Sequence, residues 1–286
     1  YRFQARNDEA LAVYDQALTL FRQVGDRLGE AKTLKAQGDV YGFLKRNDEA
    51  LAVYDQALAL FRQVGSRLGE ANTLKAQGDV YGFLKRNDEA LAVYDQALAL
   101  FRQVGDRLGE ANTLKAQGDV YRFQARNDEA LAVYDQALTL FRQVGDRLGE
   151  ANTLKAQGDV YRFQARNDEA LAVYDQALTL FRQVGDRLGE ANTLKAQGEI
   201  ALAAGEAEQA LALLAQARSL YMAVGSRVGP ANLGIILANL AEEQGDLAAA
   251  IEHLQPAADF CVATGHPLGA QLQARIDGWR AQLGGA

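Results

Sequence analysis

The sequence RLGEANTLKAQGDVYRFQARNDEALAVYDQALTLFRQVGD fills residues 107–146 and recurs without a difference over residues 147–186. The preceding block, residues 67–106, differs from it at four positions, and residues 27–66 differ from residues 67–106 at two. After Gly198 the copies diverge, but small residues keep the 40-residue phase. A fixed period of this length predicts an array of stacked repeats, in which each repeat buries its apolar face against its neighbours.

Each 40-residue block contains two stretches with the apolar spacing of an amphipathic α-helix. In residues 67–106 the first stretch is expected to bury Leu68, Ala71, Leu74, Gly78 and Tyr81. The second is expected to bury Ala90, Leu91, Tyr94, Ala97, Leu98, Phe101 and Val104. The spacing predicts helices near residues 8–24, 27–45 and 48–64, and then every 40 residues. Because the connections have only two to four residues, consecutive helices should be antiparallel neighbours.

Short polar residues and glycines mark the expected helix ends. Asn87 and Asp88 are predicted to form a turn and to cap the second helix of the block by accepting its free N–H groups. Gly105 should end that helix in the left-handed conformation, and Asp106 should cap the next one. The seven glycines at the phase of Gly69 lie in the first turns of first helices, where close packing is the expected reason for them.

The set Leu74, Gly78, Tyr81, Ala90, Tyr94 and Ala97 resembles the tetratricopeptide repeat (TPR) signature in spacing and residue type. The 40-residue period is similar to the variant in Pins-type polarity adaptors, kinesin light chains and sensor arrays of bacterial regulatory ATPases. The resemblance covers residues 1 to about 265 and implies an all-α, right-handed α-solenoid of antiparallel helix pairs, a TPR-like superhelix. One departure is Gln77, which stands where the family usually has Leu.

We predict one TPR-like repeat domain over residues 1–286. It comprises a truncated half repeat (1–26), six repeats (27–66, 67–106, 107–146, 147–186, 187–226 and 227–266) and a C-terminal capping helix (267–286). The capping helix should turn Leu268, Leu272, Ile276 and Trp279 inward, with His266 capping its start. Residues 1–6 read as a severed first helix, which should leave Leu11, Tyr14, Leu18 and Phe21 without cover. Self-association through this uncapped N-terminal end is therefore expected.

Composition argues against several classes of function. A net charge of −7 is the wrong sign for a nucleic-acid partner, and the 14-residue apolar stretch 228–241 is too short and interrupted for a membrane span. The single cysteine, Cys261, fits a reducing compartment, so a cytoplasmic location is predicted, and it is expected to be a buried apolar residue. No nucleophile, metal or phosphate-loop pattern occurs, so we expect neither an enzyme nor a cofactor or metal site.

In the TPR family the first helices line a concave groove that holds a peptide, so the resemblance implies a protein or peptide partner. By phase, the groove columns here are Asn72, Lys75, Asp79, Asn112, Lys115, Asp119, Arg122, Phe123, Asn152, Lys155, Asp159, Arg162, Phe163, Asn192 and Lys195. The Asn amides could bond a peptide backbone, the cations could pair with carboxylates, and the Phe rings could pack on apolar side chains.

Two alternatives stay open at this stage. Lys75 and Asp79 are four residues apart on one helix, so they could neutralise each other and simply keep the groove solvated. Gly42 and Gly82 give way to Arg122 and Arg162 at one phase, which suits an acidic partner but is equally explained by drift among duplicated copies. The function predicted is a protein-interaction scaffold; the alternative is a ligand-sensing or oligomerisation arm of a larger regulatory ATPase-type protein.

Overall fold

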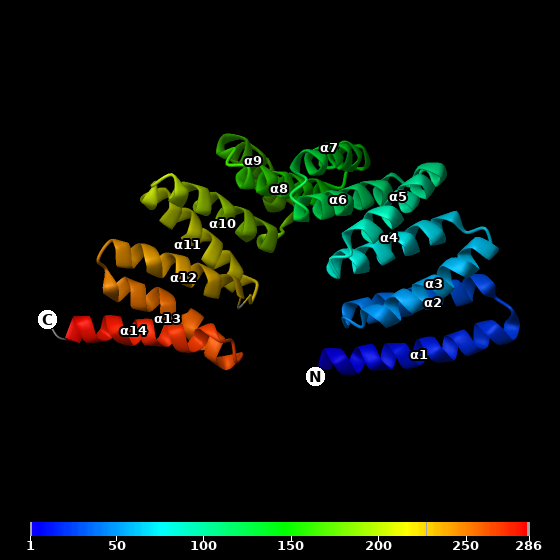
Figure 1. Ribbon diagram of the computed structural model, residues 1–286, viewed down its shortest axis with the longest axis horizontal. Helices are drawn as coiled ribbons and strands as arrows, with labels where there is room; N and C mark the ends of the chain where they lie inside the picture. Colours follow the sequence, from blue (N-terminus) through cyan, green and yellow to red (C-terminus); the bar gives the residue numbers. More distant parts are fainter. Residues whose placement is uncertain (1, 227, 285–286) are drawn as a thin grey trace. The chain divides into compact units, whose positions relative to one another are not determined.

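The computed structural model describes residues 2–226 and 228–284, and this part of the chain is built of helices without a strand (Figure 1). The helices are α1 (Arg2–Val24), α2 (Arg27–Phe43), α3 (Asn47–Gln63), α4 (Arg67–Phe83), α5 (Asn87–Val104), α6 (Arg107–Phe123), α7 (Asn127–Val144), α8 (Arg147–Phe163), α9 (Asn167–Val184), α10 (Arg187–Ala203), α11 (Ala207–Ala223), α12 (Val228–Glu243), α13 (Leu247–Ala263) and α14 (Leu268–Gly284).

The chain divides into two compact units, and each is described by itself. Unit 1 (Tyr1–Thr153) contains the pairs α2/α3, α4/α5 and α6/α7, with α3 packed on α4 and α5 packed on α6. Unit 2 (Leu154–Ala286) contains the pairs α10/α11 and α12/α13, and α14 packs against α13. The all-α solenoid of antiparallel helix pairs is therefore confirmed. The division into six repeats within one domain stays a prediction.

The core of each repeat is completed by the repeat before it. In unit 1, Ala71 and Leu74 of α4 pack against Ala97 and Phe101 of α5, and Leu58 of α3 closes the cluster from the preceding repeat. All five are at most 4% exposed. Because each such cluster draws side chains from two repeats, a single repeat could not bury its apolar face alone.

Glycines allow consecutive helices to approach closely, both within a repeat and between successive repeats. A Cβ added at Gly78 would overlap the ring of Tyr94, and one added at Gly69 would overlap the ring of Phe61. The same contacts recur at the equivalent glycines of unit 1, such as Gly109 with Phe101 and Gly118 with Tyr134. The expectation that the Gly69-phase glycines serve close packing is confirmed.

The ends of the second helices are as predicted. Gly105 ends α5 with φ +73°, and the Asp106 Oδ1 accepts the backbone N–H of Gly109 at 2.9 Å. Ser66 holds the same position before α4 but makes no side-chain capping bond.

The prediction that Asn87 and Asp88 cap α5 is wrong. Arg86 is the N-cap, it makes no side-chain capping bond, and Asn87 is already helical. The reversal is made by the backbone, because Lys85 takes φ +58° and the N–H of Arg86 donates to the carbonyl of Tyr81 at 2.9 Å. This Schellman arrangement usually contains glycine at the left-handed position, and here a non-glycine residue occupies it. The first-turn acids Asp88 and Glu89 then act through the helix dipole.

Three expected core positions lie at the surface instead. Leu68 is 46% exposed and Val104 is 42% exposed, because each lies at the end of its helix, beyond the region where the two helices touch. In α14, Leu272, Ile276 and Trp279 are buried as predicted, but Leu268, the first residue of the helix, is 40% exposed. His266 does cap α14: its Nδ1 accepts the N–H of Leu268 at 3.3 Å. Cys261 is buried, as expected.

The N-terminal prediction needs correction. Helix α1 runs unbroken from Arg2 to Val24, although the later repeats of unit 1 turn at the phase of residues 4–6. The later repeats turn here through a left-handed residue such as Ala125, which costs energy, and the continuous helix of α1 avoids this conformation. Leu11 and Leu18 are buried, whereas Val13 and Leu20 are 60% and 61% exposed. The apolar face left open on α1 is therefore not the one expected.

The close approach at Gly78 gives a direct test of the packing. Gly78→Ala forces a methyl group into the Tyr94 ring, and overpacking of this kind should destabilise the array by about 1–3 kcal/mol. Gly82→Ala on the same helix is the matched control, since its added Cβ would meet Val120 Cγ2 at an ordinary 3.7 Å. That variant should gain up to about 1 kcal/mol from better helix propensity. Urea midpoints followed by circular dichroism compare the two, and equal midpoints would contradict the packing.

Candidate peptide-binding face of the first helices

The predicted groove residues fall on the first helices of both units. In unit 1 they lie on α4, α6 and the start of α8: Asn72, Lys75, Asp79, Asn112, Lys115, Asp119, Arg122, Phe123 and Asn152. In unit 2 they lie on the remainder of α8 and on α10: Lys155, Asp159, Arg162, Phe163, Asn192 and Lys195. The exposed face that these residues form in unit 1, together with Phe43 and Phe83, is called the first-helix face below.

Each groove lysine forms an ion pair on its own helix. Lys75 Nζ lies 2.7 Å from Asp79 Oδ2, and Lys115 lies at the same distance from Asp119. In unit 2, Lys155 pairs with Asp159 and Lys195 with Glu199, also at 2.7 Å. The lysines and the acids therefore do neutralise each other's charge on their own helices, as the alternative interpretation of these columns expected. Each ammonium still has further N–H groups to donate.

The groove aspartates are also bound from the core. The hydroxyl of Tyr94, which is 2% exposed, donates to Asp79 Oδ1 at 2.9 Å. Both oxygens of Asp79 thus accept a hydrogen bond, one from Tyr94 and one from Lys75. Sequence reasoning placed the tyrosine in the core and missed this bond. The signal available was the tyrosine itself, because a buried phenol hydroxyl requires a partner.

The tyrosine hydroxyls are held in the protonated state. Burial, and then the negative charge of Asp79, raise the pKa of Tyr94 far above its usual value of about 10. The pKa values of three others are raised for the same reasons: Tyr54 beside Asp39, Tyr134 beside Asp119, and in unit 2 Tyr174 beside Asp159. Each is bonded to its aspartate at 2.7–2.9 Å.

The departure at Gln77 has a structural reason. Gln77 is 3% exposed, and its Nε2 donates to Oδ1 of Asp55, on the second helix of the preceding repeat, at 2.7 Å. The same bond links Gln117 to Asp95 at 2.9 Å. Where the family usually places Leu, this chain thus has a polar link between successive repeats, and Asp55 is a second partner that sequence reasoning missed.

The asparagine column is not uniform. The amides of Asn72 and Asn112 each donate to a backbone carbonyl of their own helix at 3.0 Å, which points their donors away from a ligand. Their Oδ1 atoms are the groups left to accept a bond from a peptide N–H. In unit 2, Asn192 Oδ1 accepts the hydroxyl of Tyr221.

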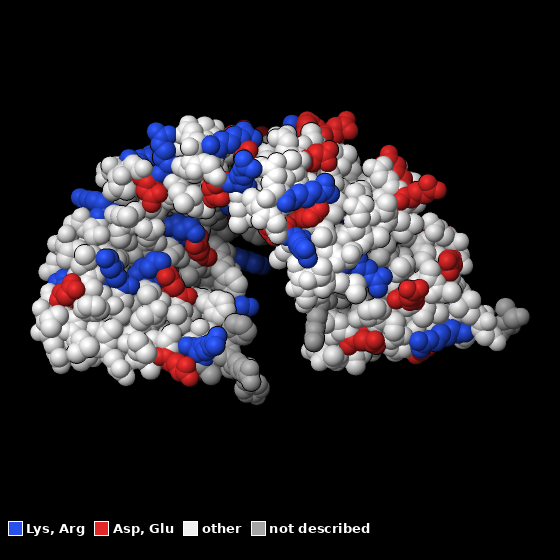
Figure 2. Space-filling model, turned by 180° about the vertical axis from the view of Figure 1, so that it is seen from behind, with Lys and Arg blue, Asp and Glu red and all other residues white. Residues whose placement is uncertain are grey.

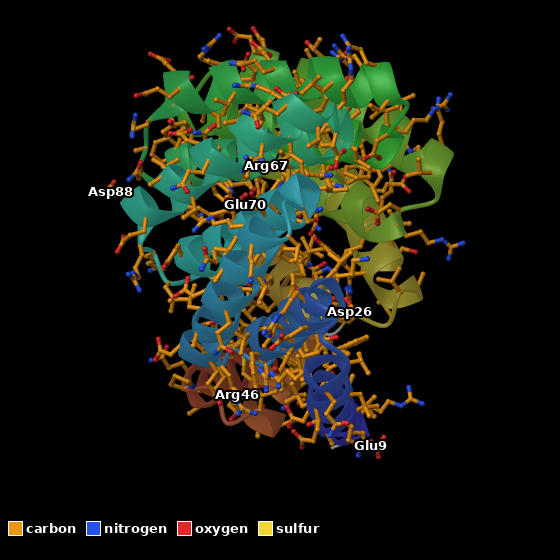
Figure 3. All side chains as sticks on the ribbon, turned by 90° about the vertical axis from the view of Figure 1, so that its right-hand side faces the viewer. Glu9, Asp26, Arg46, Arg67, Glu70 and Asp88 are labelled. Carbon is orange, nitrogen blue, oxygen red and sulfur yellow. The ribbon has the colours of Figure 1, made fainter. Side chains whose placement is uncertain are left out.

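Arg122 and Arg162, which stand at the phase of the earlier glycines, both contact neighbouring side chains. In unit 2, Arg162 Nη1 lies 2.8 Å from Glu199 Oε2, so an acidic residue offsets its charge. In unit 1, the Arg122 guanidinium lies 4.8 Å from the centre of the Phe123 ring. On the visible side of the molecule, Figure 2 shows positive and negative side chains interspersed. The start of α4 gives one example, labelled in Figure 3, where buried Glu70 accepts bonds from Arg62 at 2.6 Å and Arg67 at 3.4 Å.

Exposed aromatic rings end the first helices. Phe43, Phe83 and Phe123 in unit 1 are 71%, 59% and 75% exposed, and Phe163 in unit 2 is 74% exposed. Phe43 and Phe83 line a cavity of about 270 Å³ with Asp39, Asp79 and the inner face of α4. An adjoining cavity of about 340 Å³ is lined by Lys35, Lys75, Asp39, Asp79, Asn72 and Asn112, among others. Apolar and polar recesses therefore share the carboxylates of Asp39 and Asp79.

Among residues 2–226 and 228–284, no three His, Cys, Asp or Glu side chains are grouped so as to hold a metal ion. No helix in these ranges has the length and apolar character needed to cross a membrane.

A family model described as tetratricopeptide repeat matches residues 1–63, 69–143, 109–183 and 149–223. No curated protein matches the chain. Among solved structures, the apo form of RapI is similar with a TM-score of 0.70 and 17% identity, over 91% of this chain and 93% of that one. A Rap protein complexed with Competence and Sporulation Factor gives a TM-score of 0.63 and 15% identity, over 96% and 86%. The apo quorum sensor NprR from B. thuringiensis gives 0.61 and 14%, over 94% and 82%.

The Tyr–Asp bonds predict a loss of stability in alkali. A pKa that is raised on folding favours the folded state below the unfolded pKa of about 10, and this contribution falls as the pH rises above 10. Replacing Tyr54, Tyr94 and Tyr134 by Phe should lower the urea midpoint at pH 7 and flatten its decline between about pH 10 and 11. The matched control replaces the half-buried Tyr41, Tyr81 and Tyr121 by Phe. An equal flattening in the control would argue against the assignment.

Proposed function

Because the chain belongs to the tetratricopeptide repeat family, we propose that it is a protein-interaction scaffold that binds a peptide or protein partner on its first-helix face. The observation that carries the proposal is the series of exposed rings Phe43, Phe83 and Phe123 at the ends of successive first helices, of which Phe43 and Phe83 line the cavity of about 270 Å³. Large aromatic side chains exposed in a series around recesses are typical of interaction surfaces. The equivalent residues of unit 2 are proposed to contact a partner in the same way.

The polar columns fit the backbone and acidic side chains of such a partner. Asp79 is already bonded to Lys75 and Tyr94, so it acts as a fixed support for the ammonium group. The remaining N–H groups of Lys75 and Lys115 can donate to a carboxylate or a peptide carbonyl, and Oδ1 of Asn72 can accept a peptide N–H. Apolar side chains of the partner would enter the cavity between Phe43 and Phe83.

A Rap protein of similar fold is described in complex with a factor, which supports binding of a separate polypeptide by this kind of array. The second candidate is a ligand-sensing or oligomerisation arm of a larger regulatory protein, and the similarity to the quorum sensor NprR favours it. A cytoplasmic location stays a prediction from the single, buried Cys261.

Binding can be tested with peptides selected from a random library against the full chain. Replacing Phe43 and Phe83 by Ser should weaken the selected peptides by about tenfold or more, because each buried ring contributes on the order of 1.5–3 kcal/mol. The matched control replaces Val64 and Val104, which are 40% and 42% exposed at the ends of second helices, by Ser. Equal affinity of both variants, measured by titration calorimetry, would place the site elsewhere.

Self-association is the other part of the proposal. Val13 and Leu20 expose an apolar face on α1, and because the repeats are nearly identical, a second copy presents surfaces shaped to pack on it. Val13→Ser with Leu20→Ser should lower the mass measured by light scattering at high protein concentration. The control replaces Leu108 and Leu148, each 44% exposed, by Ser. A mass that is monomeric at every concentration before mutation would show that this face binds no second copy.

A further inference from the structure

The contacts between successive repeats follow one pattern in unit 1. At the junction of repeats 67–106 and 107–146, Asp95 accepts a bond from Gln117 at 2.9 Å, and Arg102 pairs with Glu110 at 2.6 Å. Leu98 packs against Val133 and the core of the following repeat. Two carboxylates and one cation therefore belong to this junction, and all of them have partners.

The junction of repeats 187–226 and 227–266, within unit 2, has lost both polar pairs. Ala215 and Leu237 stand at the phases of Asp95 and Gln117. Met222 and Pro230 stand at the phases of Arg102 and Glu110. Both members of each pair are replaced together, and both carboxylates are gone.

A cation has entered the same junction. Arg218 stands at the phase of Leu98, and His253 stands at the phase of Val133. Arg218 Nη1 lies 3.1 Å from His253 Nδ1. Burial, and then the charge of Arg218, lower the pKa of His253, so that at neutral pH the imidazole is uncharged and its Nδ1 accepts the bond. The acids whose charges act on His253 are Glu252 and Asp246. Among the described residues, no carboxylate lies within ion-pair distance of Arg218.

All of these replacements except Pro230 line a pocket of about 430 Å³. Its apolar lining residues are Leu211, Ala215, Met222 and Leu237, and its polar lining residues are Arg218, Ser219 and His253. Met222 is 62% exposed, so the pocket opens to solvent along an apolar edge. The volume lies within the range of about 300–1,000 Å³ that is usual for small-molecule sites.

We propose that this pocket binds a small amphipathic carboxylate, a molecule with one carboxylate on a short apolar chain. The carboxylate would take a two-point bond from the Arg218 guanidinium and so supply the anion that the junction has lost. The apolar chain would lie on Leu237 and Met222. An alcohol of the same length would gain the apolar contact but leave the guanidinium without an anion. The site is independent of the first-helix face, because helices α11 and α13 supply most of its lining.

Titration calorimetry of the full chain with octanoate, and with octanol, tests the proposal. Octanoate should bind, and the affinity for octanol should be lower by about tenfold or more. Arg218→Leu restores the residue of the other junctions, so it should fold normally and lose octanoate affinity by about tenfold or more. Ala215→Asp restores their carboxylate one helical turn from Arg218, and it should weaken octanoate similarly with the arginine still present.

The matched control is Arg166→Gln, which removes an exposed positive charge of unit 2 that belongs neither to the pocket nor to the groove columns. It should leave octanoate affinity unchanged, so that a loss at Arg218 reflects the pocket rather than the net charge. Binding of octanoate to Arg218→Leu with undiminished affinity would overturn the proposal. So would the absence of any octanoate heat at millimolar concentration. Neither result would affect the first-helix face, whose test uses peptides and the Phe43 and Phe83 variant.

Discussion

The contact between a tyrosine ring and a glycine on the facing helix holds each complete repeat of unit 1 together and also sets its surface. Because Gly78 has no side chain, the ring of Tyr94 lies directly on α4, and its hydroxyl reaches Asp79. Asp79 in turn fixes the ammonium of Lys75 at the surface. The position of a proposed ligand-binding cation therefore follows from core packing, so a change in helix spacing would move the binding face as well.

Periodicity was sufficient to predict the helices and their pairing, since both depend on spacing within one helix or one repeat. The partners of Tyr94 and Gln77 could not be found in this way. They lie 15 and 22 residues away, and which polar groups meet there depends on the angle between packed helices. The cap at Arg86 was missed because the backbone makes that turn with a left-handed Lys85, a conformation that residue preference argues against.

Near-identical repeats let one junction serve as the reference for another. A buried amide left without its carboxylate would cost about 1–3 kcal/mol, so Asp95 or Gln117 could hardly be replaced alone. At the later junction both positions have changed, to Ala215 and Leu237, which is the pattern that this cost imposes. Arg218 is the exception, because it replaced a core leucine without bringing a carboxylate to pair with it. The loss of both polar pairs is explained by stability. Arg218 has the uncharged His253 as a partner but no carboxylate, and the proposed ligand would supply that missing anion.

The same energetic comparison decides what the first-helix face contributes to binding. The Lys–Asp pairs are about one-third exposed on the lysine side, and solvated ion pairs are worth only about 0–1 kcal/mol. If Lys75 exchanges Asp79 for a carboxylate of the bound peptide, little free energy of binding is gained. The contact still selects for the charge and the orientation of the peptide. Phe43, Phe83 and Phe123 are the groups that still have most of their surface to bury. Affinity on this face should come mainly from apolar side chains spaced to reach successive rings, and selectivity from the fixed charges between them.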